Sequence, residues 1–377
     1  MTSVKELIKR YCIDEIEEYA RDLNSACPVA QVHNEFSPES IYTLAERGDL
    51  QGSNLIWECL TCGLCRQITG NRIDMSRFIR EIRSLAFQAG CTGTQTHGGM
   101  VITAQRLSTN PNLRPGSPGW IPDSLRVTRG RGVYLYWVGG APYFSALVPD
   151  LVPVAIESAR AAIHLLNHIG IVPVVLEETR FSGHDLLWTG DVEGFQRLAE
   201  QNLRAIDKSG AKRIIVSSPE DYHTLSLDYG EYFGEMDFEV CHISEIIAEH
   251  LSDLRLGRWE KRLTYHDPCR LGRGMGIYDA PRRILGSIPG VELVEMEHTR
   301  ELSRCCGTSC WTNCTRYSKL LQVNRLQEAV DTGADLLVTS CWECAMHLNC
   351  AMRPSAWHQV RVEIADLVVL AGSLLEA

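Results

Sequence analysis

Apolar and polar positions follow a helical period along roughly the first hundred residues. The stretch SVKELIKRYCIDEIEEYARDL (3–23) places apolar residues at helical spacing with charges between them. A second helix is predicted in SPESIYTLAERGDL (37–50), with a start at Ser37 and a stop at Gly48. A third is predicted in DMSRFIREIRSLAFQAG (74–90). The pattern therefore predicts a mostly helical N-terminal region.

From residue 132 the pattern changes to short apolar runs separated by helical stretches. The runs are GVYLYWV (132–138), GIVPVVL (170–176), AKRIIVSS (211–218), RLTYHD (262–267), VELVEM (291–296) and ADLLVTS (334–340). The helical stretches are AIESARAAIHLLNHIG (155–170), DVEGFQRLAEQNLRAIDKSG (191–210) and SKLLQVNRLQEAVDTG (318–333). Alternation of strands and helices predicts parallel α/β layers.

The α/β region also repeats itself. Residues 190–225 match residues 312–348 in period and order: a helix ends at glycine, a strand follows, and a short polar turn comes next. In this alignment Ser218 and Asp221 fall where Cys341 and Cys344 fall. A boundary between the copies is expected near residue 255.

Composition narrows the class of protein. The 377 residues carry a net charge of −10, which argues against a nucleic-acid binder. No basic segment followed by an apolar run opens the sequence, so we expect no secretory signal. The longest apolar candidate, ADLVVLAGSLL (365–375), is too short to span a bilayer. We expect a cytoplasmic chain without a transmembrane segment, either free or peripheral to a membrane complex.

Cysteine is the unusual residue of this chain. There are 15, and an odd number excludes complete disulfide pairing within one chain. Clustered cysteines in a large cytosolic protein indicate metal or redox chemistry. The clusters are Cys59, Cys62 and Cys65; Cys305, Cys306, Cys310 and Cys314; and Cys341, Cys344 and Cys350.

The first cluster, CLTCGLC, has the C-x2-C-x2-C spacing of bacterial ferredoxins, in which three thiolates face one iron-sulfur cube. The fourth cysteine of such a run would stand at position 69, which is Thr69. In two-cluster ferredoxins the fourth ligand comes from the other run, and Cys27-Pro28 resembles the end of one.

The three cysteines expected before Cys27 are replaced by Glu17, Ala20 and Leu23. One complete ligand set therefore remains, and we infer a single cubane [4Fe-4S] cluster on Cys27, Cys59, Cys62 and Cys65. A zinc site or a group of reduced core thiols is the alternative.

The segments YHDPCRLGRGMGIYD (265–279), SRCCGTSC (303–310) and TSCWECAMHL (339–348) resemble the cysteine-rich (CCG) domain of the heterodisulfide reductase family. Cys269 is followed by 35 residues, then Cys305-Cys306, then 34 residues, then Cys341 and Cys344. The last gap is one residue shorter than is usual in the family. The resemblance covers nearly the whole chain, as a B/C-type or D-type fusion, and is weakest over 100–131.

The resemblance implies that these five cysteines hold a noncubane [4Fe-4S] cluster made of two fused smaller units. The adjacent pair Cys305-Cys306 would bind neighbouring irons and carry the catalytic role, and the glycine that follows would permit a tight turn. Further candidates near this cluster are Cys310, Cys314 and His266. Cys310 and Cys314 either touch the cluster, form a substrate-facing thiol pair or are ordinary buried thiols. His266 and the neighbouring Asp267 either tune the cluster, supply a proton or hold a turn.

The first repeat has lost the pattern. Gly140 stands at the first ligand position, Phe181-Ser182 replaces the cysteine pair, and Ser218 and Asp221 replace C-x2-C. We therefore predict a repeat that keeps its fold and holds no cluster. The remaining cysteines, Cys12, Cys91, Cys241 and Cys350, are expected in the core.

These observations predict an α+β and α/β multidomain chain in which a helical ferredoxin-like domain precedes two repeated CCG-type α/β domains. The expected parts are a helical domain (1–104), a linker rich in proline and glycine (105–131), a degenerate CCG repeat (132–255) and a cluster-bearing CCG domain (256–377).

The resemblance implies an electron-transfer subunit of an anaerobic redox complex, with electrons passing between the two clusters. The terminal reaction would be reductive cleavage of a disulfide-type bond or the reverse of that reaction. The chain shows no dinucleotide fingerprint, so a flavin would lie on a partner, such as a flavin-containing A-type subunit, with a ferredoxin or cytochrome as another partner. One alternative is a non-catalytic wire and scaffold that joins a catalytic module to an electron-bifurcating module. Another is a zinc-stabilised interaction protein.

Overall fold

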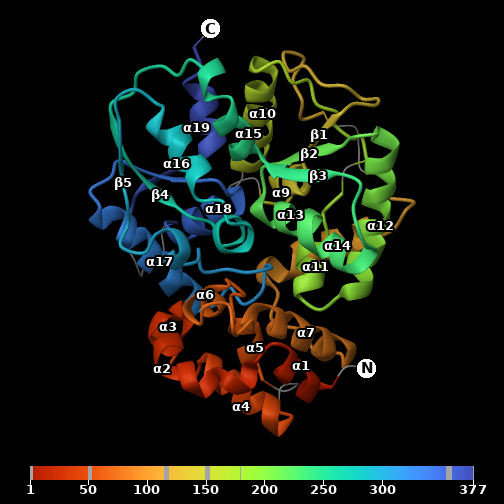
Figure 1. Cartoon of the computed structure of the whole chain (residues 1–377), viewed down its shortest axis with the longest axis vertical. Coiled ribbons are helices and arrows are strands. Elements are labelled where there is room, and N and C mark those ends of the chain that lie inside the picture. The colour runs from red at the N-terminus through yellow and green to blue at the C-terminus, as the bar shows by residue number, and fades with distance from the viewer. Residues whose placement is uncertain are drawn as a thin grey trace.

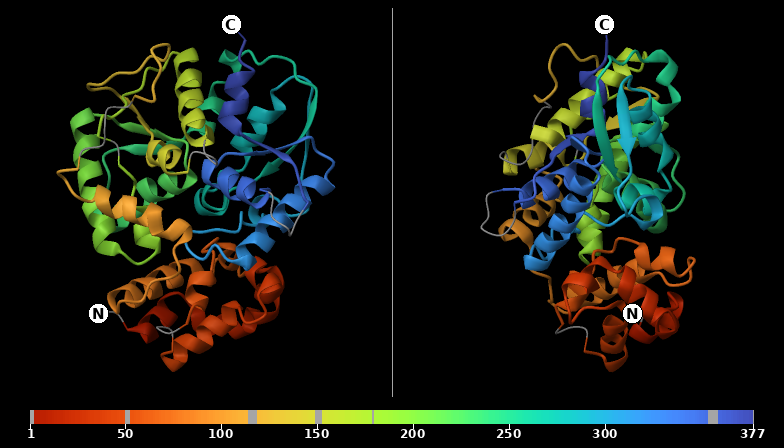
Figure 2. Two further views of the ribbon diagram at one scale, coloured as in Figure 1. Left: turned by 180° about the vertical axis from the view of Figure 1, so that it is seen from behind. Right: turned by 90° about the vertical axis from the view of Figure 1, so that its left-hand side faces the viewer.

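The computed structural model describes residues 3–49, 53–113, 119–148, 153–178, 180–353 and 359–376. Residues 114–118 of the predicted linker lie outside the described residues. Figure 1 shows a helical part at one end of the molecule and two α/β units side by side at the other. The same arrangement is visible from behind and from the side in Figure 2.

The N-terminal region is helical, as its pattern predicts. Its helices are α1 (Val4–Arg10), α2 (Ile16–Ala26), α3 (Pro28–Val32), α4 (Pro38–Arg47), α5 (Leu55–Glu58), α6 (Leu64–Ile68), α7 (Met75–Gln88) and α8 (Met100–Ser108). Helix α4 is capped by the Ser37 side chain and ends at Gly48, whose φ of 77° suits glycine. The pattern over 3–23 gives two helices, because Cys12 adopts a left-handed conformation between them.

The first α/β unit contains a parallel sheet of order β1-β2-β3. Its strands are β1 (Tyr134–Trp137), β2 (Arg213–Val216) and β3 (Glu239–His242). The predicted strand at 170–176 forms only isolated parallel bridges, which Val174 makes to Thr128 and Leu135 beside β1. The helices are α9 (Ala141–Leu147), α10 (Pro153–His168), α11 (His184–Trp188), α12 (Val192–Ser209), α13 (Pro219–His223), α14 (Tyr229–Phe233) and α15 (Ile243–Glu249).

The second unit contains a parallel sheet of order β5-β4-β6-β7. Its strands are β4 (Lys261–His266), β5 (Val291–Val294), β6 (Leu336–Thr339) and β7 (Glu363–Asp366). Its helices are α16 (Asp279–Gly286), α17 (Arg316–Asp331), α18 (Trp342–Ala351) and α19 (Leu367–Ser373). The predicted strands at 262–267, 291–296 and 334–340 are confirmed, and the parallel pairing confirms the α/β layers.

The two units share one plan. With the bridges of Val174 in place of a strand, the first sheet has the same order as the second, and β1 and β4 hold equivalent places. Helix α19 of the second unit packs against α10 of the first, between the two sheets (Figure 1). The carboxyl ends of parallel strands meet at one edge of a sheet, which is where such folds place their functional groups.

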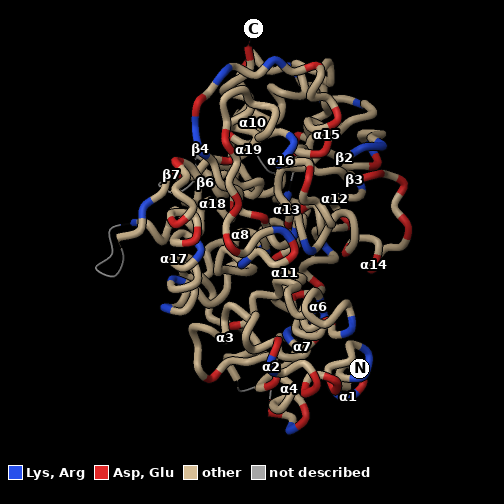
Figure 3. The backbone as a smooth tube through the Cα atoms, turned by 60° about the vertical axis from the view of Figure 1, so that its left-hand side comes forward, with Lys and Arg blue, Asp and Glu red and all other residues tan. Residues whose placement is uncertain are grey.

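Charged residues of both signs are spread along the whole backbone (Figure 3). Among the helices that the structure describes, none has the length and apolar character needed to cross a membrane.

Candidate functional site

Four N-terminal cysteines surround one cavity. Cys27, Cys59, Cys62 and Cys65 line a space of about 490 Å³, part of it open to solvent, together with apolar side chains such as Leu23. All four thiols are free. The structure therefore brings Cys27 to the three cysteines of the CLTCGLC run.

Helix ends and tight turns position these thiols. Cys59 is the C-cap of α5, and Cys27 precedes Pro28, the first residue of α3. Between the cysteines of the run, Thr61 and Gly63 have φ values of 47° and 76°. These left-handed residues fold the chain back on itself, so that thiols spaced by two residues face one side.

Burial makes the thiolate form unfavourable in this cavity. It raises the pKa of the Cys27 thiol to about 12 and that of Cys59 to about 11, and the pKa of Cys65 rises as well. Such thiols stay protonated unless a cation replaces their protons, which is what metal binding does. Four partly buried thiols around one cavity fit an iron-sulfur cluster.

Thr69 stands where a further ligand of a two-cluster ferredoxin would be. Its side chain is buried, donates to the carbonyl of Cys65 (2.9 Å) and accepts from the amide of Ile73 (3.1 Å). Thr69 therefore closes the end of helix α6 through hydrogen bonds.

The five CCG cysteines meet at the carboxyl edge of the second sheet. Cys269 follows β4, and Cys341 follows β6 as the N-cap of α18. The backbone amide of Cys344 donates to the Cys341 sulfur at 3.1 Å. Cys305 and Cys306 lie in the loop that reaches the same edge, and both are buried.

Thiol–thiol contacts connect all five cysteines. Cys269 contacts Cys305, Cys305 contacts Cys306, Cys306 contacts Cys344, and Cys344 contacts Cys341. The hydrogen bonds from Cys305 and Cys344 lower the pKa of the Cys306 thiol to about 6. Burial raises the pKa of Cys341 to about 12. Five enclosed, mutually contacting thiols fit a multi-iron cluster with the thiols as ligands.

The loop after the adjacent pair is tightly constrained. Gly307 has a φ of 84°, and a side chain there would meet the Ser318 carbonyl oxygen at 2.9 Å. Cys310, Trp311 and Asn313 also have positive φ. Strained residues of this kind concentrate at functional sites, where packing holds them in place.

The two thiol sets adjoin each other. Arg270, next to Cys269, donates to the carbonyl (2.9 Å) and hydroxyl (3.0 Å) of Thr61 between Cys59 and Cys62. The Arg273 Nε donates to the Cys62 carbonyl at 2.7 Å. All nine cysteines belong to one hydrophobic cluster that runs from the helical part into the second unit.

In the first unit other residues stand at the positions that correspond to the five cysteines, and an aromatic side chain packs there. A side chain at Gly140 would meet the Phe181 ring at 2.8 Å, and Phe181 stacks on Tyr143 at 4.6 Å. The Ser218 hydroxyl accepts from the Asp221 amide at 3.3 Å, the same cap that Cys341 makes with Cys344. The fold of the ligand turn is kept without its thiols.

The other cysteines differ in exposure. Cys310 is buried beside Ser309, whereas Cys314 is exposed, so the interpretation of Cys314 as a buried thiol is wrong. Of the four cysteines expected in the core, only Cys241 is buried; Cys12, Cys91 and Cys350 are partly exposed because they lie at turns and helix ends. The side of the second thiol set near Cys310 is thus covered by protein.

His266 and Asp267 take part in buried networks. The Arg325 Nε donates to His266 Nδ1 at 3.0 Å, and burial keeps the pKa of His266 well below its usual value. Asp267 accepts two hydrogen bonds from Arg282, at 2.7 and 2.9 Å. These contacts brace the turn that carries Cys269 and leave His266 neutral.

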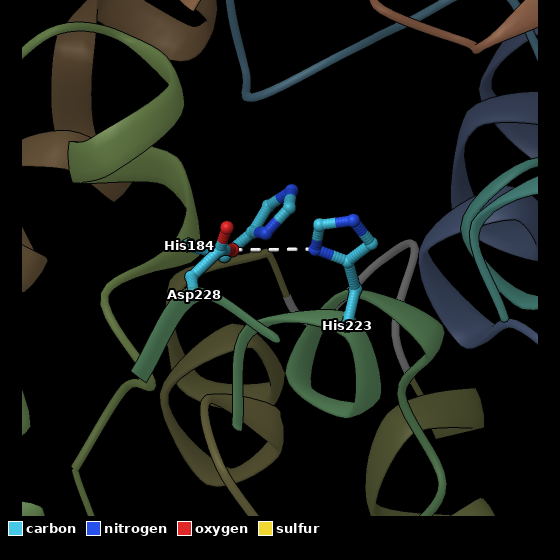
Figure 4. Close-up of side chains that lie close together, drawn as sticks. All are labelled: His184, His223 and Asp228. Carbon is cyan, nitrogen blue, oxygen red and sulfur yellow. Dashed lines mark hydrogen bonds and ion pairs between the residues drawn. The ribbon is translucent and has the colours of Figure 1, made fainter. Parts of the chain in front are cut away.

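Figure 4 shows a third group, in which His184 and His223 lie beside Asp228. Their donor atoms are close enough to hold a metal ion. Asp228 however already accepts from Arg80 (3.2 Å) and from the Thr224 hydroxyl (3.1 Å). An adjacent guanidinium disfavours a cation. This group is better explained as a polar network that fastens α7 to the first unit.

Sequence reasoning missed the arginines that join the thiol sets. Arg270 comes directly after Cys269 and Arg273 stands three residues later, but the backbone groups that they contact lie about two hundred residues upstream. Arg83 of α7 was missed too: it donates to the Cys59 carbonyl (2.7 Å) and to the Trp188 carbonyl (3.1 Å). In the sequence near Cys269, only the spacing of the two arginines in the CRLGR motif could have indicated these contacts.

Comparison with known proteins finds similar sequences. The family described as CCG, cysteine-rich domain, matches residues 263–349. The chain is 30% identical over 305 residues to a subunit of the dihydromethanophenazine:CoB–CoM heterodisulfide reductase of Methanosarcina mazei, covering 77% of this chain and 71% of that protein. It is 29% identical to the probable iron-sulfur-binding oxidoreductase FadF of Bacillus subtilis, over 88% of this chain and 48% of that one.

A hypothetical protein from Helicobacter pylori has a similar fold. The TM-score is 0.58 at 12% identity, over 99% of this chain and 77% of that one, and the likeness concerns the fold alone. The match to the Methanosarcina mazei protein extends well beyond the cysteine-rich domain and includes most of both chains. The chain therefore belongs to the heterodisulfide reductase family.

Proposed function

We propose that this chain is an iron-sulfur electron-transfer subunit of a heterodisulfide-reductase-like complex. Cys27, Cys59, Cys62 and Cys65 would hold a cubane [4Fe-4S] cluster. Cys269, Cys305, Cys306, Cys341 and Cys344 would hold a noncubane one. When bound, such clusters supply one-electron carriers whose potentials respond to burial and hydrogen bonding.

The observation that carries the proposal is the direct junction between the two thiol sets. Arg270 and Arg273 extend from the turn after Cys269 to the backbone between Cys59 and Cys62. Buried guanidinium groups hold the two sets at a fixed separation and place positive charge between them. A fixed, water-poor junction suits electron transfer.

The names of the relatives support this role. They include a heterodisulfide reductase subunit, an iron-sulfur-binding oxidoreductase and other reductase subunits. We propose that this chain likewise works with partner subunits, among them a flavin-containing subunit and a ferredoxin or cytochrome. We also propose division of the chain into a helical part (1–104), a connecting segment (105–131), a repeat without a cluster (132–255) and a CCG domain (256–377).

The terminal step of the proposed function is reduction of a disulfide-type bond at the second thiol set. The chain's own contribution is enclosure: Cys305 and Cys306 are buried and the Cys310 side is covered. This covering also favours the second candidate, a wire and scaffold without substrate chemistry, because a covered site offers a small disulfide no open approach on that side.

Potentiometric titration followed by electron paramagnetic resonance tests the proposal. We expect two centres in the wild type, loss of one in Cys59→Ser and loss of the other in Cys306→Ser. The Cys91→Ser control should keep both, because Cys91 lines neither thiol set. Unchanged spectra in either ligand variant would remove that assignment.

Adding a small-molecule disulfide to the reduced protein separates the two candidates. Oxidation of the centre lost in Cys306→Ser, with two thiols formed per disulfide, indicates catalysis. Rapid reduction of a ferredoxin without loss of disulfide indicates a wire.

A further inference from the structure

A buried cavity separates the two α/β units at the edge where the second thiol set lies. It encloses about 300 Å³, part of it open to solvent. The polar residues that line it and matter here are Gln105, His184, Asp185, Glu220, Asp221 and Glu343. They come from α8 and from both units. Asp221 stands at the position in the first unit that corresponds to Cys344 in the second.

The carboxyl groups of this cavity lack a cationic partner. Within the described part of the chain, neither Asp185 nor Asp221 forms an ion pair with lysine or arginine, and Glu220 lies 4.0 Å from His184. Burial raises the pKa of Asp185 to about 7 and that of Asp221 to about 6. Burial and the nearby Asp185 also raise the pKa of Glu220.

Several other groups face these three carboxyls. They are Tyr136, His184, Tyr229, Cys269, Arg270, Cys310 and Glu343. Arg270 is the only arginine or lysine among them, and it lowers the pKa of Asp185 and Glu220 by less than burial raises them.

Polar atoms at the cavity are left without partners. Among the described residues, no hydrogen bond reaches Asp185 Oδ1, Gln105 Oε1 or His184 Nε2. All three side chains are more than nine-tenths buried, and all three line the cavity. Buried polar atoms without a partner are costly, so a water molecule or protonation of the carboxyl group would satisfy them.

Two carboxyl groups of the cavity reach its surroundings. The Glu220 side chain is 22% exposed. On the other side, Glu343 accepts from the Ser218 hydroxyl at 2.8 Å, and its second carboxyl oxygen lies 3.4 Å from the Cys341 sulfur. No metal ion is expected between them, because the described carboxylates of the cavity do not form a group with donor atoms within 4.8 Å.

We propose that this cavity is a proton store, in which Asp185, Glu220 and Asp221 take up protons from water and deliver them for bond cleavage at the second thiol set. The inference rests on the proposed function. Cleavage of R–S–S–R′ needs two electrons and two protons. The S–S bond breaks and two S–H bonds form. The electrons come from the reduced partner through this subunit, and the carboxyls recover their protons from water.

Infrared spectroscopy of the anaerobic protein tests the store without any turnover. At pH 5 the wild type should show the carbonyl band of protonated carboxylic acids, and this band should weaken as the pH rises to 9. Asp185→Asn and Asp221→Asn should each lose part of it at pH 5. Asp207→Asn, on the exposed face of α12, is the control and should change nothing in this band. Absence of the band at pH 5 in the wild type would overturn the proposal.

The midpoint potential of the centre lost in Cys306→Ser gives a second readout. If reduction draws a proton into the cavity, the potential falls by up to about 59 mV per pH unit, the value for one proton per electron. We expect this slope to fall by half or more in Asp185→Asn and in Asp221→Asn, and to persist in Asp207→Asn. A flat slope in the wild type, or equal slopes in all variants, would refute proton storage.

The two readouts separate this proposal from the proposed function. The infrared band comes from carboxyl groups and does not depend on iron. It therefore tests the proton store even in protein that contains no cluster. Should one variant fail to fold, the other aspartate variant carries the same expectation.

Discussion

Cys305 and Cys306 are adjacent in the chain, buried, and joined by thiol contacts to Cys269 on one side and Cys344 on the other. Adjacent cysteines seldom form a disulfide, because the required geometry is hard to reach between neighbours. Here each has a different partner. Two thiols that face different neighbours within one enclosed group are suited to bind different irons of one cluster.

Gly307 makes this arrangement possible, and Gly307→Ala should damage it. The substitution places a methyl group 2.9 Å from the Ser318 carbonyl oxygen at a φ of 84°, which alanine adopts only with strain. We expect a loss of about 1–3 kcal/mol in unfolding free energy, measured by urea denaturation, and reduced iron content.

Gly286→Ala is the matched control for that variant. Gly286 ends helix α16 with open space where the methyl group would lie, so its stability should stay equal or rise slightly. Equal stability of the Gly307→Ala protein and this control would show that the turn does not need glycine.

At the scale of the element, the cap of the last helix carries a titratable carboxyl group. Asp366 caps α19 by accepting from the amides of Val368 and Val369, and burial raises its pKa to about 7 from a usual value of 3.8. The folded chain therefore keeps a proton that the unfolded chain loses between about pH 4 and 7. The contribution of this carboxyl group to the free energy of unfolding is therefore complete at low pH and declines as the pH rises from about 4 to about 7.

Asp366→Asn should remove this decline, because the amide keeps a capping oxygen and has no charge to bury. We expect the apparent melting temperature to exceed that of the wild type by a few degrees at pH 8 and to equal it near pH 4. Asp207→Asn, which is exposed, should show no such dependence. A constant difference at both pH values would show that the cap carboxyl is not protonated in the fold.

Elements with a regular period or a continuous apolar run could be predicted from sequence, and strands without such a run could not. The helix at 74–90 and the strand at 334–340 were predicted close to their bounds, as α7 and β6. β3 and β7 were missed because their sequences, EVCH and EIAD, contain no run of three apolar residues. The run at 170–176 makes only isolated bridges, since Pro173 lacks a backbone amide to pair.

Cysteine spacing also indicated which thiols lie near one another, because a turn of fixed length limits where its side chains point. The cavity of carboxyl groups was not predicted. Asp185 and Glu343 are far apart in the chain, and only the packing of the two units brings them to one space.

At the scale of the whole molecule, the helical part and the second unit are held together at the thiol sets themselves. Arg273 donates to the Cys62 carbonyl and also to the carbonyls of Glu301 and Ser303. One side chain thus joins the two ligand loops. The proposed electron path crosses this junction, so the junction should be rigid.

Arg273→Met should loosen it. The variant leaves three partly buried carbonyls without this donor, at a total cost of about 1–3 kcal/mol. We expect amide hydrogen exchange over residues 59–65 to become at least tenfold faster, with exchange in the sheet strands unchanged.

Arg258→Met is the control for that variant, since Arg258 forms only an exposed pair with Glu260. Unchanged exchange over 59–65 in Arg273→Met would mean that this arginine does not hold the junction.

The central claim is that one chain carries two different iron-sulfur centres. Iron, zinc and acid-labile sulfide per chain, measured on anaerobically purified protein together with Mössbauer spectra, tests it most directly. We predict about eight irons per chain, which corresponds to two [4Fe-4S] clusters. The Mössbauer spectra should show that one of the two is not a cubane. Zinc without sulfide would contradict the claim.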